Sequence, residues 1–264
     1  YFATSGRKDI YDVVRDGEWT IDYMYDITSQ IWEDADSNGE HSSGDTLGFV
    51  GVAKHDNGAM DSWFYALGCN LTVMDESVGE PVAAFYDEHT IQAYEKLVKL
   101  YGDNEGAWAL TESGQSHGDT SFTNGNAMMT QAKFSTGSSY REVNFAFGVL
   151  PVPKFDTEQT SYIAIPEVTS SMVTVLSTVE DDRIDMVSAT LELMSYESYK
   201  RVTPAYIDVV LKSKNANSPD DAEMAQTIID SIVYSFGWIF SSTHMADMGK
   251  AFRMINRDMT NYYE

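Results

Sequence analysis

Apolar residues recur every three or four positions in several parts of the chain, which is the spacing of one face of a helix. The first such helix is predicted to begin at Thr20, a residue type that caps helix N-termini well. Its apolar stripe consists of Ile21, Met24, Ile27 and Ile31. The same spacing predicts further helices at Asp61–Leu67, at Asp87–Tyr101, after Thr178 with Pro204 as its limit, after Ser218, and in a last segment from Met245 to Ile255.

Short apolar runs between these helices are predicted to be strands. They are Leu47–Ala53, Ala127–Met129, Phe145–Leu150, Tyr162–Ile165 and Met172–Leu176. Strands that alternate with long helices are typical of an α/β fold.

The composition is that of a folded protein with a large acidic excess. Of the 264 residues 43% are hydrophobic, and 17 Lys and Arg stand against 41 Asp and Glu, a formal net charge of −24. Such a surface repels phosphate, which argues against nucleic acid as a partner and against electrostatic attachment to an anionic membrane. Cys69 is the only cysteine and the five histidines lack zinc spacing, so internal disulfides and a zinc site are not expected.

An acidic segment between the first helix and the first strand has the pattern of a calcium loop. Oxygen-bearing side chains alternate along it, with Gly39 at the position of the sharp turn. The candidate ligands are Asp34, Asp36, Asn38, Glu40 through its backbone carbonyl, Ser42 and Asp45. Asp45 stands where the usual bidentate ligand is Glu. The alternative is an acidic turn exposed to solvent.

Two patterns leave an enzyme open as an alternative. Gly114–Gly118 matches the G-x-S-x-G elbow of serine hydrolases, which would make Ser116 the nucleophile of an esterase. The segments around it are polar, whereas an elbow follows a buried strand. A pair of carboxylates for glycoside hydrolysis is also conceivable, but no spacing singles out two of the 41 acidic residues.

Aromatic residues lie beside acidic or polar residues at the ends of predicted elements, as in Asp61–Tyr65 and Phe236–Trp238. Sugar rings stack on aromatic planes, and their hydroxyls bind carboxylates and amides. Such pairs are therefore suited to carbohydrate capture in a cleft. The alternative for each aromatic is packing in the core.

Four segments, in order along the chain, resemble motifs of the extracellular solute-binding proteins of ABC importers. The likeness is to the carbohydrate-binding, family 1-like type common in Gram-positive gut bacteria. The segments are Val14–Asp22, Asp45–Phe49 after the acidic loop, Phe122–Met129 and Phe147–Lys154. The chain departs from the family at Asp45 and at Met128, where Ala is usual. The long segment that precedes these motifs in the family, with its signal peptide and lipid-anchored cysteine, is also not in this sequence.

The resemblance implies an incomplete two-lobed α/β fold of the periplasmic-binding-protein kind (type II). Residues 1–147 would form mostly one lobe. Residues 148–264 would supply the hinge crossing, return strands of the other lobe and C-terminal helices. The implied roles in ligand binding fall on Asp61, Trp63, Gln131, Phe134 and Trp238. The acid and the amide would bind hydroxyls, and the aromatic rings would stack on sugars.

The implied function is the substrate-binding component of an ABC importer, which captures a sugar or oligosaccharide and catalyses nothing. Its partners would be the permease subunits. It would be an extracellular, cell-surface lipoprotein, attached to the membrane only through a lipid anchor outside this chain. An oligopeptide ligand, a hydrolase and a calcium-stiffened adhesin are the alternatives.

Overall fold

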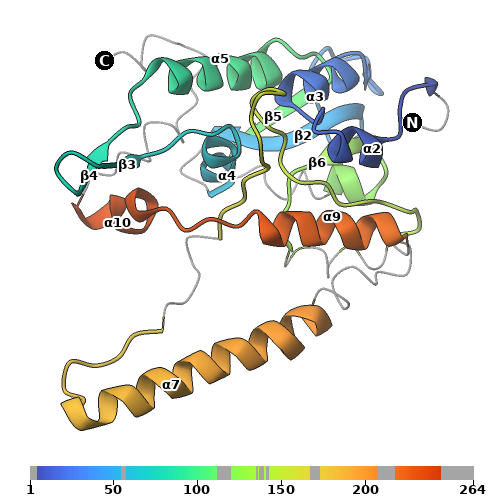
Figure 1. The fold of residues 1–264 in the computed structure, drawn as a ribbon. Coiled ribbons are helices and arrows are strands. Elements are labelled where there is room, and N and C mark those ends of the chain that lie inside the picture. The colour runs from blue at the N-terminus through green and yellow to red at the C-terminus, as the bar shows by residue number, and fades with distance from the viewer. Residues whose placement is uncertain are drawn as a thin grey trace.

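The computed structural model describes residues 5–54, 58–111, 120–134, 136, 140, 143–166, 173–206 and 218–244. Helices and strands mix along the chain, which confirms the α/β class (Figure 1). The helices are α2 (Ile10–Arg15), α3 (Ile21–Thr28), α4 (Gly58–Ala66), α5 (Glu88–Gly102), α7 (Asp181–Glu197), the π-helical turn η3 (Ser198–Val202), α9 (Pro219–Asp230) and α10 (Phe236–His244). The strands are β1 (Trp32–Glu33), β2 (Thr46–Lys54), β3 (Thr72–Asp75), β4 (Glu80–Ala83), β5 (Ala107–Thr111) and β6 (Ala127–Thr130).

The main sheet is built around β2, the predicted strand Leu47–Ala53. It pairs in parallel with β5 and β6 and antiparallel with the short β1, so the sheet is mixed. Phe49 lies opposite Ala107 of β5 and Met129 of β6. The apolar residues of β2 from Leu47 to Ala53 are buried whichever face of the sheet they lie on. This is expected of a central strand with both faces covered.

Three of the helices start directly after N-capping residues that can be recognised in the sequence. The side chains of Thr20, Asp87 and Ser218 accept hydrogen bonds from backbone N–H groups in the first turns of α3, α5 and α9. Gly68 ends the turn after α4 with φ of 81°, a conformation that favours glycine. Helix α2 was not predicted. It begins at Ile10, after the capping residue Asp9, and buries Val13.

The core lies between the sheet and the helices α3, α4 and α5. Helices α3 and α5 pack side by side (Figure 1). Their buried apolar faces meet aromatic side chains of β2 and α4, among them Phe49 and Trp63. Cys69 is buried at the edge of this core, 2% exposed, and burial raises the pKa of its thiol to about 12.

The strands predicted after β6 do not form as expected. Residues 145–150 and 162–165 are irregular, apart from an isolated bridge between Ala164 and Ile232. The prolines at 151 and 153 explain part of this, because proline cannot donate to a strand ladder. The segment 145–166, named here the crossing segment, instead packs on α2 and α3. Trp19 Nε1 donates to the Pro151 carbonyl at 2.9 Å, and Tyr162 Oη donates to the Val14 carbonyl at 3.0 Å.

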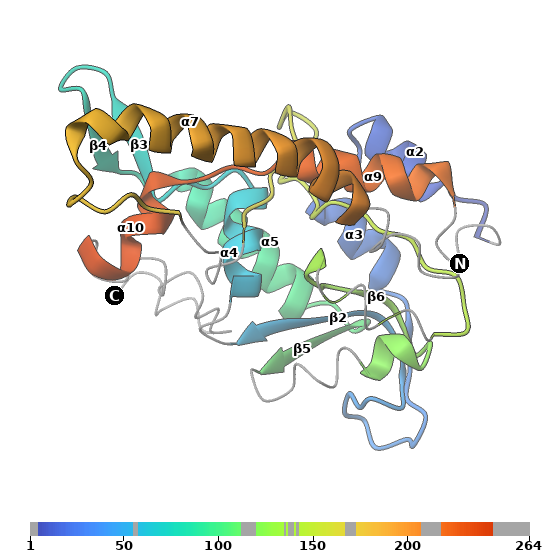
Figure 2. The same cartoon turned by 90° about the horizontal axis from the view of Figure 1, so that it is seen from below.

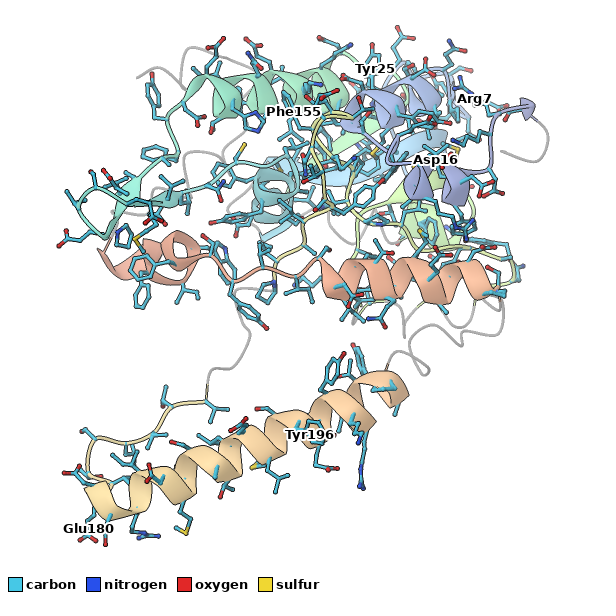
Figure 3. The ribbon with its side chains drawn as sticks, in the orientation of Figure 1. Arg7, Asp16, Tyr25, Phe155, Glu180 and Tyr196 are labelled. Carbon is cyan, nitrogen blue, oxygen red and sulfur yellow. The ribbon has the colours of Figure 1, made fainter. Side chains whose placement is uncertain are left out.

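Helix α7 is the long helix predicted after Thr178, but no residue of it is buried. It stands apart from the body that holds the sheet in Figure 1, and in the view from below it is drawn in front of that body (Figure 2). From Glu180 to Tyr196 its side chains project from the helix into open space (Figure 3). Pro204 does not end the helix as predicted. The chain passes through η3 into the helical residues 203–206.

Two other predicted segments have different outcomes. Within Met172–Leu176, the described residues 173–176 form no strand, and Val173 and Leu176 are exposed. The last predicted helix, Met245–Ile255, lies outside the described residues. The hairpin of β3 and β4, which was not predicted, forms a separate two-stranded sheet.

Candidate functional site

A cavity of about 410 Å³ lies where the crossing segment passes the end of β6, and it is named here the central cavity. Its deepest residues belong to the core, including Trp19, Phe49 and Trp63. Ala132 and Lys133, which follow β6, are exposed and mark its rim. Three of the five residues predicted to bind ligand, Trp63, Gln131 and Phe134, contribute to its lining.

Trp63 does not offer the open ring face that was expected of it. Its side chain is 1% exposed, and its ring meets Phe49 and Tyr101 edge to face. Its Nε1 donates to Tyr101 Oη and to Gln131 Oε1, each at 3.1 Å. The prediction that a sugar stacks on Trp63 is therefore wrong, because α4 turns this residue toward β2 and its indole completes the core.

Gln131 joins β6 to α4. While its Oε1 accepts from Trp63, its Nε2 donates to the Ala59 carbonyl at 3.1 Å and to Ser62 Oγ at 2.8 Å. The amide thus already has partners at both ends within the protein. Phe134 is half-buried and lines the same cavity, so its ring is the predicted aromatic surface that a ligand at the rim would meet.

Asp61 and Trp238 form a pair elsewhere. Trp238 Nε1 donates to Asp61 Oδ2 at 3.2 Å, which ties α10 to α4. Asp61 is 4% exposed, and neither residue lines the central cavity. The structure therefore does not bring Asp61 and Trp238 into one cavity with the other predicted ligand-binding residues, because the acid and the indole are used to dock α10.

The acidic loop brings three of its six candidate ligands together. Carboxylate oxygens of Asp34, Asp36 and Asp45 lie within 4.8 Å of one another, so this group could hold a metal ion. Asn38 and Glu40 take part in the turn itself, since Asn38 Nδ2 donates to Asp36 Oδ2 and the Glu40 N–H donates to Asn38 Oδ1.

Asp45 is the buried member of the acidic group. It accepts hydrogen bonds from the Ala35 and Ser42 N–H groups at 3.2 and 3.0 Å and from Ser42 Oγ at 3.1 Å. Trp32 Nε1 adds a longer contact at 3.4 Å. Burial alone would raise the pKa of Asp45, but these donors lower it. Asp45 is therefore held as a carboxylate that organises the loop.

The pKa of Asp34 is also lowered, in this case chiefly by the Gly39 N–H, which donates at 2.7 Å. The turn that allows this contact needs Ser37 and Gly39 with positive φ, at 59° and 77°. The loop thus stabilises the charged form of its acids without help from a basic side chain in these contacts.

Sequence reasoning missed how the central cavity is formed. Its wall on the side of the crossing segment includes Gly148, where a Cβ atom would lie only 2.1 Å from Tyr11 Oη. The glycine after Phe147 was a visible signal, but its reason depends on the packing of α2. Ser116, the candidate nucleophile, lies outside the described residues.

Among the helices that the structure describes, none is long and apolar enough to cross a membrane. Comparison of the sequence with models of known protein families gives no match, and comparison with curated proteins gives none either.

Proposed function

We propose that the chain is the substrate-binding component of an ABC importer, which captures a sugar or oligosaccharide outside the cell and catalyses nothing. The observation that carries the proposal is the position of Phe134. It comes from the segment that follows a family-like motif, Phe122–Met129, and its half-buried ring lines a cavity against a second family-like motif, Phe147–Lys154. Two motifs distant in sequence thus meet at one hollow.

The proposal includes an incomplete two-lobed fold, with the body around β2 as most of one lobe. Under this reading the crossing segment is the hinge connection, and α7 belongs to the side of the other lobe. The exposure of α7 supports this assignment, since a helix with apolar residues on its surface usually packs on a partner. The permease subunits are the proposed partners, and a lipid anchor outside this chain is the proposed attachment to the cell surface.

The experiment is a thermal-shift screen of the chain against mono- and oligosaccharides. A ligand at a hundredfold over its Kd should add roughly 2.7 kcal/mol of stability. F134A should weaken binding of the sugar found by about tenfold or more, as for an aromatic anchor. F236A, which removes an exposed ring outside the central cavity, is the matched control and should bind normally.

The same screen tests the alternatives. Stabilisation by oligopeptides but by no sugar would show that the ligand is a peptide and not a carbohydrate. Turnover of a chromogenic ester that is lost in S116A, or turnover of a chromogenic glycoside, would show that the protein is a hydrolase and not a binding protein. Equal losses of sugar affinity in F134A and F236A would show that neither ring acts as a specific contact.

We also propose that the ion suited to the acidic loop is Ca²⁺ in a structural role. Hard carboxylate and carbonyl oxygens are its preferred ligands. Calorimetry should detect heat on addition of millimolar Ca²⁺, and chelator should lower the melting temperature. D34N should abolish both effects, whereas D75N, which alters the acid at the end of β3, should leave them unchanged. No heat and no change in melting temperature would reject the site.

A further inference from the structure

The central cavity is unusual because its depth is formed by core residues. Trp19, Met24, Phe49 and Trp63 are each no more than 4% exposed, yet all of them border a space of about 410 Å³. Protein interiors are close-packed, and voids larger than a water molecule are few. A space of this size lies instead within the range of about 300–1,000 Å³ that is typical of small-molecule sites.

Three polar side chains around this space donate to partners within the protein. Trp19 Nε1 donates to the Pro151 carbonyl and Trp63 Nε1 to Gln131 and Tyr101. Thr130 Oγ1 donates to the Val50 carbonyl at 3.1 Å. Among the buried lining residues, a hydroxyl-rich ligand would lose its hydrogen bonds to water and find few replacements, which is costly. An apolar group would gain by leaving water.

The charges near the cavity select against ions. None of the described lining residues is Asp or Glu, so the lining offers no carboxylate to an organic cation. Lys133 at the rim already takes part in an interaction. The net charge of −24 disfavours anions approaching from solvent.

The size of the space sets the size of the occupant. An engineered apolar cavity of about 150 Å³ in another protein holds one benzene molecule. A space of about 410 Å³ is therefore large enough for two linked or fused rings. From size, lining and charge we infer that the central cavity binds a neutral, mainly apolar compound of about two rings. This inference does not rest on the proposed capture of sugars, which concerns Phe134 at the rim.

The test is a fluorescence titration of the full chain with N-phenyl-1-naphthylamine, a neutral two-ring probe that brightens in apolar surroundings. Saturable binding of one probe per chain is expected. M128W places a large ring in the cavity wall, and A132W places one at its exposed rim. Each should weaken probe binding by at least tenfold. The rim variant disturbs no buried packing, so it keeps the test valid if M128W fails to fold.

Controls exclude adsorption to other apolar surfaces. L193S removes an exposed apolar side chain from α7, and M74W enlarges one on strand β3 of the β3–β4 hairpin. Both should bind the probe as the unaltered chain does. The inference is overturned if the probe shows no saturable binding. It is equally overturned if L193S loses the probe while A132W keeps it. A negative sugar screen would leave this result unaffected, so the two proposals fail separately.

Discussion

At the scale of single residues, the end of α3 shows how closely the backbone is fitted. Thr28 is fully buried, and its Oγ1 donates to the Met24 carbonyl and accepts from Asn104 Nδ2, both at 2.8 Å. Asn104 Oδ1 in turn accepts from the Gly106 N–H. Gly48 and Gly106 pass against Thr28 so closely that neither has space for a side chain.

Substitution of Gly106 by alanine should therefore destabilise the protein. The added Cβ would lie 1.9 Å from the Thr28 carbonyl oxygen, a backbone atom that cannot move aside alone. We expect a loss of about 1–3 kcal/mol or more in the free energy of unfolding, as for other overpacked sites. The measurement is the urea midpoint at an unchanged m-value.

Gly102 provides the matched control for this substitution. It is the last residue of α5, and a Cβ there would only meet Val98 at 3.9 Å, an ordinary contact. G102A should leave stability unchanged within about 0.5 kcal/mol or raise it, because alanine restricts the unfolded chain. Equal midpoints for G106A and the unaltered chain would contradict the close packing at Thr28.

A second residue-scale prediction concerns acid. The pKa of Asp45 is lower in the folded than in the unfolded protein. Its negative charge therefore stabilises the fold in full at pH values above its ordinary pKa of 3.8. That contribution is lost as pH falls through the lower, folded-state value. Urea midpoints measured between neutral pH and strong acid should decline less steeply for D45N, which should also be less stable at neutral pH. Parallel acid profiles would refute the role of this carboxylate.

At the scale of elements, α9 is held on α2 by side chains far apart in sequence. Arg15 pairs with Asp12 on its own helix and with Asp220 and Glu223 on α9. Beside this exposed group, Tyr11 Oη donates to Asp221, which is 4% exposed. Exposed ion pairs contribute little, whereas a buried acceptor that loses its donor is costly. The tyrosine should therefore matter more than the arginine.

Y11F tests this ordering. It keeps the ring and removes the hydroxyl, so Asp221 loses a hydrogen-bond donor, and the free energy of unfolding should fall by about 1–3 kcal/mol. R15M should cost no more than about 1 kcal/mol. Denaturant unfolding of the two variants gives the comparison. A larger loss in R15M than in Y11F would show that the ion pairs dominate the docking of α9.

The elements that could be predicted from the sequence are those whose signals are local. Thr20, Asp87 and Ser218 cap the helices that they were expected to cap, because a cap acts within one turn. The crossing segment could not be predicted. Its runs of apolar residues read as strands, but Pro151 and its neighbours use their backbone groups to hold Trp19 and Thr20, which lie far away in sequence.

The candidate site shows the same division. The acidic loop could be predicted, since one short segment supplies Asp34, Asp36 and Asp45. Trp63 could not be assigned correctly, because an aromatic residue next to polar neighbours looks the same on a rim and in a core. Only the pairing of β2 with its neighbours and the packing of α4 decide that its indole faces inward.

At the scale of the whole molecule, α7 is a long helix without a buried residue. Hydrogen exchange should show that α7 has a low local stability, because local stability follows buried contacts. Amides of α7 should exchange much faster than those of α5, which buries Leu97, Leu100 and Tyr101. Mass spectrometry of the exchanging chain gives both rates in one experiment. Protection of α7 equal to that of α5 would mean that another surface covers it.

The buried thiol of Cys69 can report how often the surrounding core opens locally. The thiol lies beside the start of α5, and because burial raises its pKa, the reactive thiolate is strongly disfavoured at neutral pH while the site is closed. The chain has no second cysteine to blur the signal. A thiol reagent therefore reacts chiefly when the packing around Cys69 opens. At reagent concentrations high enough for labelling to outpace reclosing, the rate of labelling in plain buffer equals the rate of that opening.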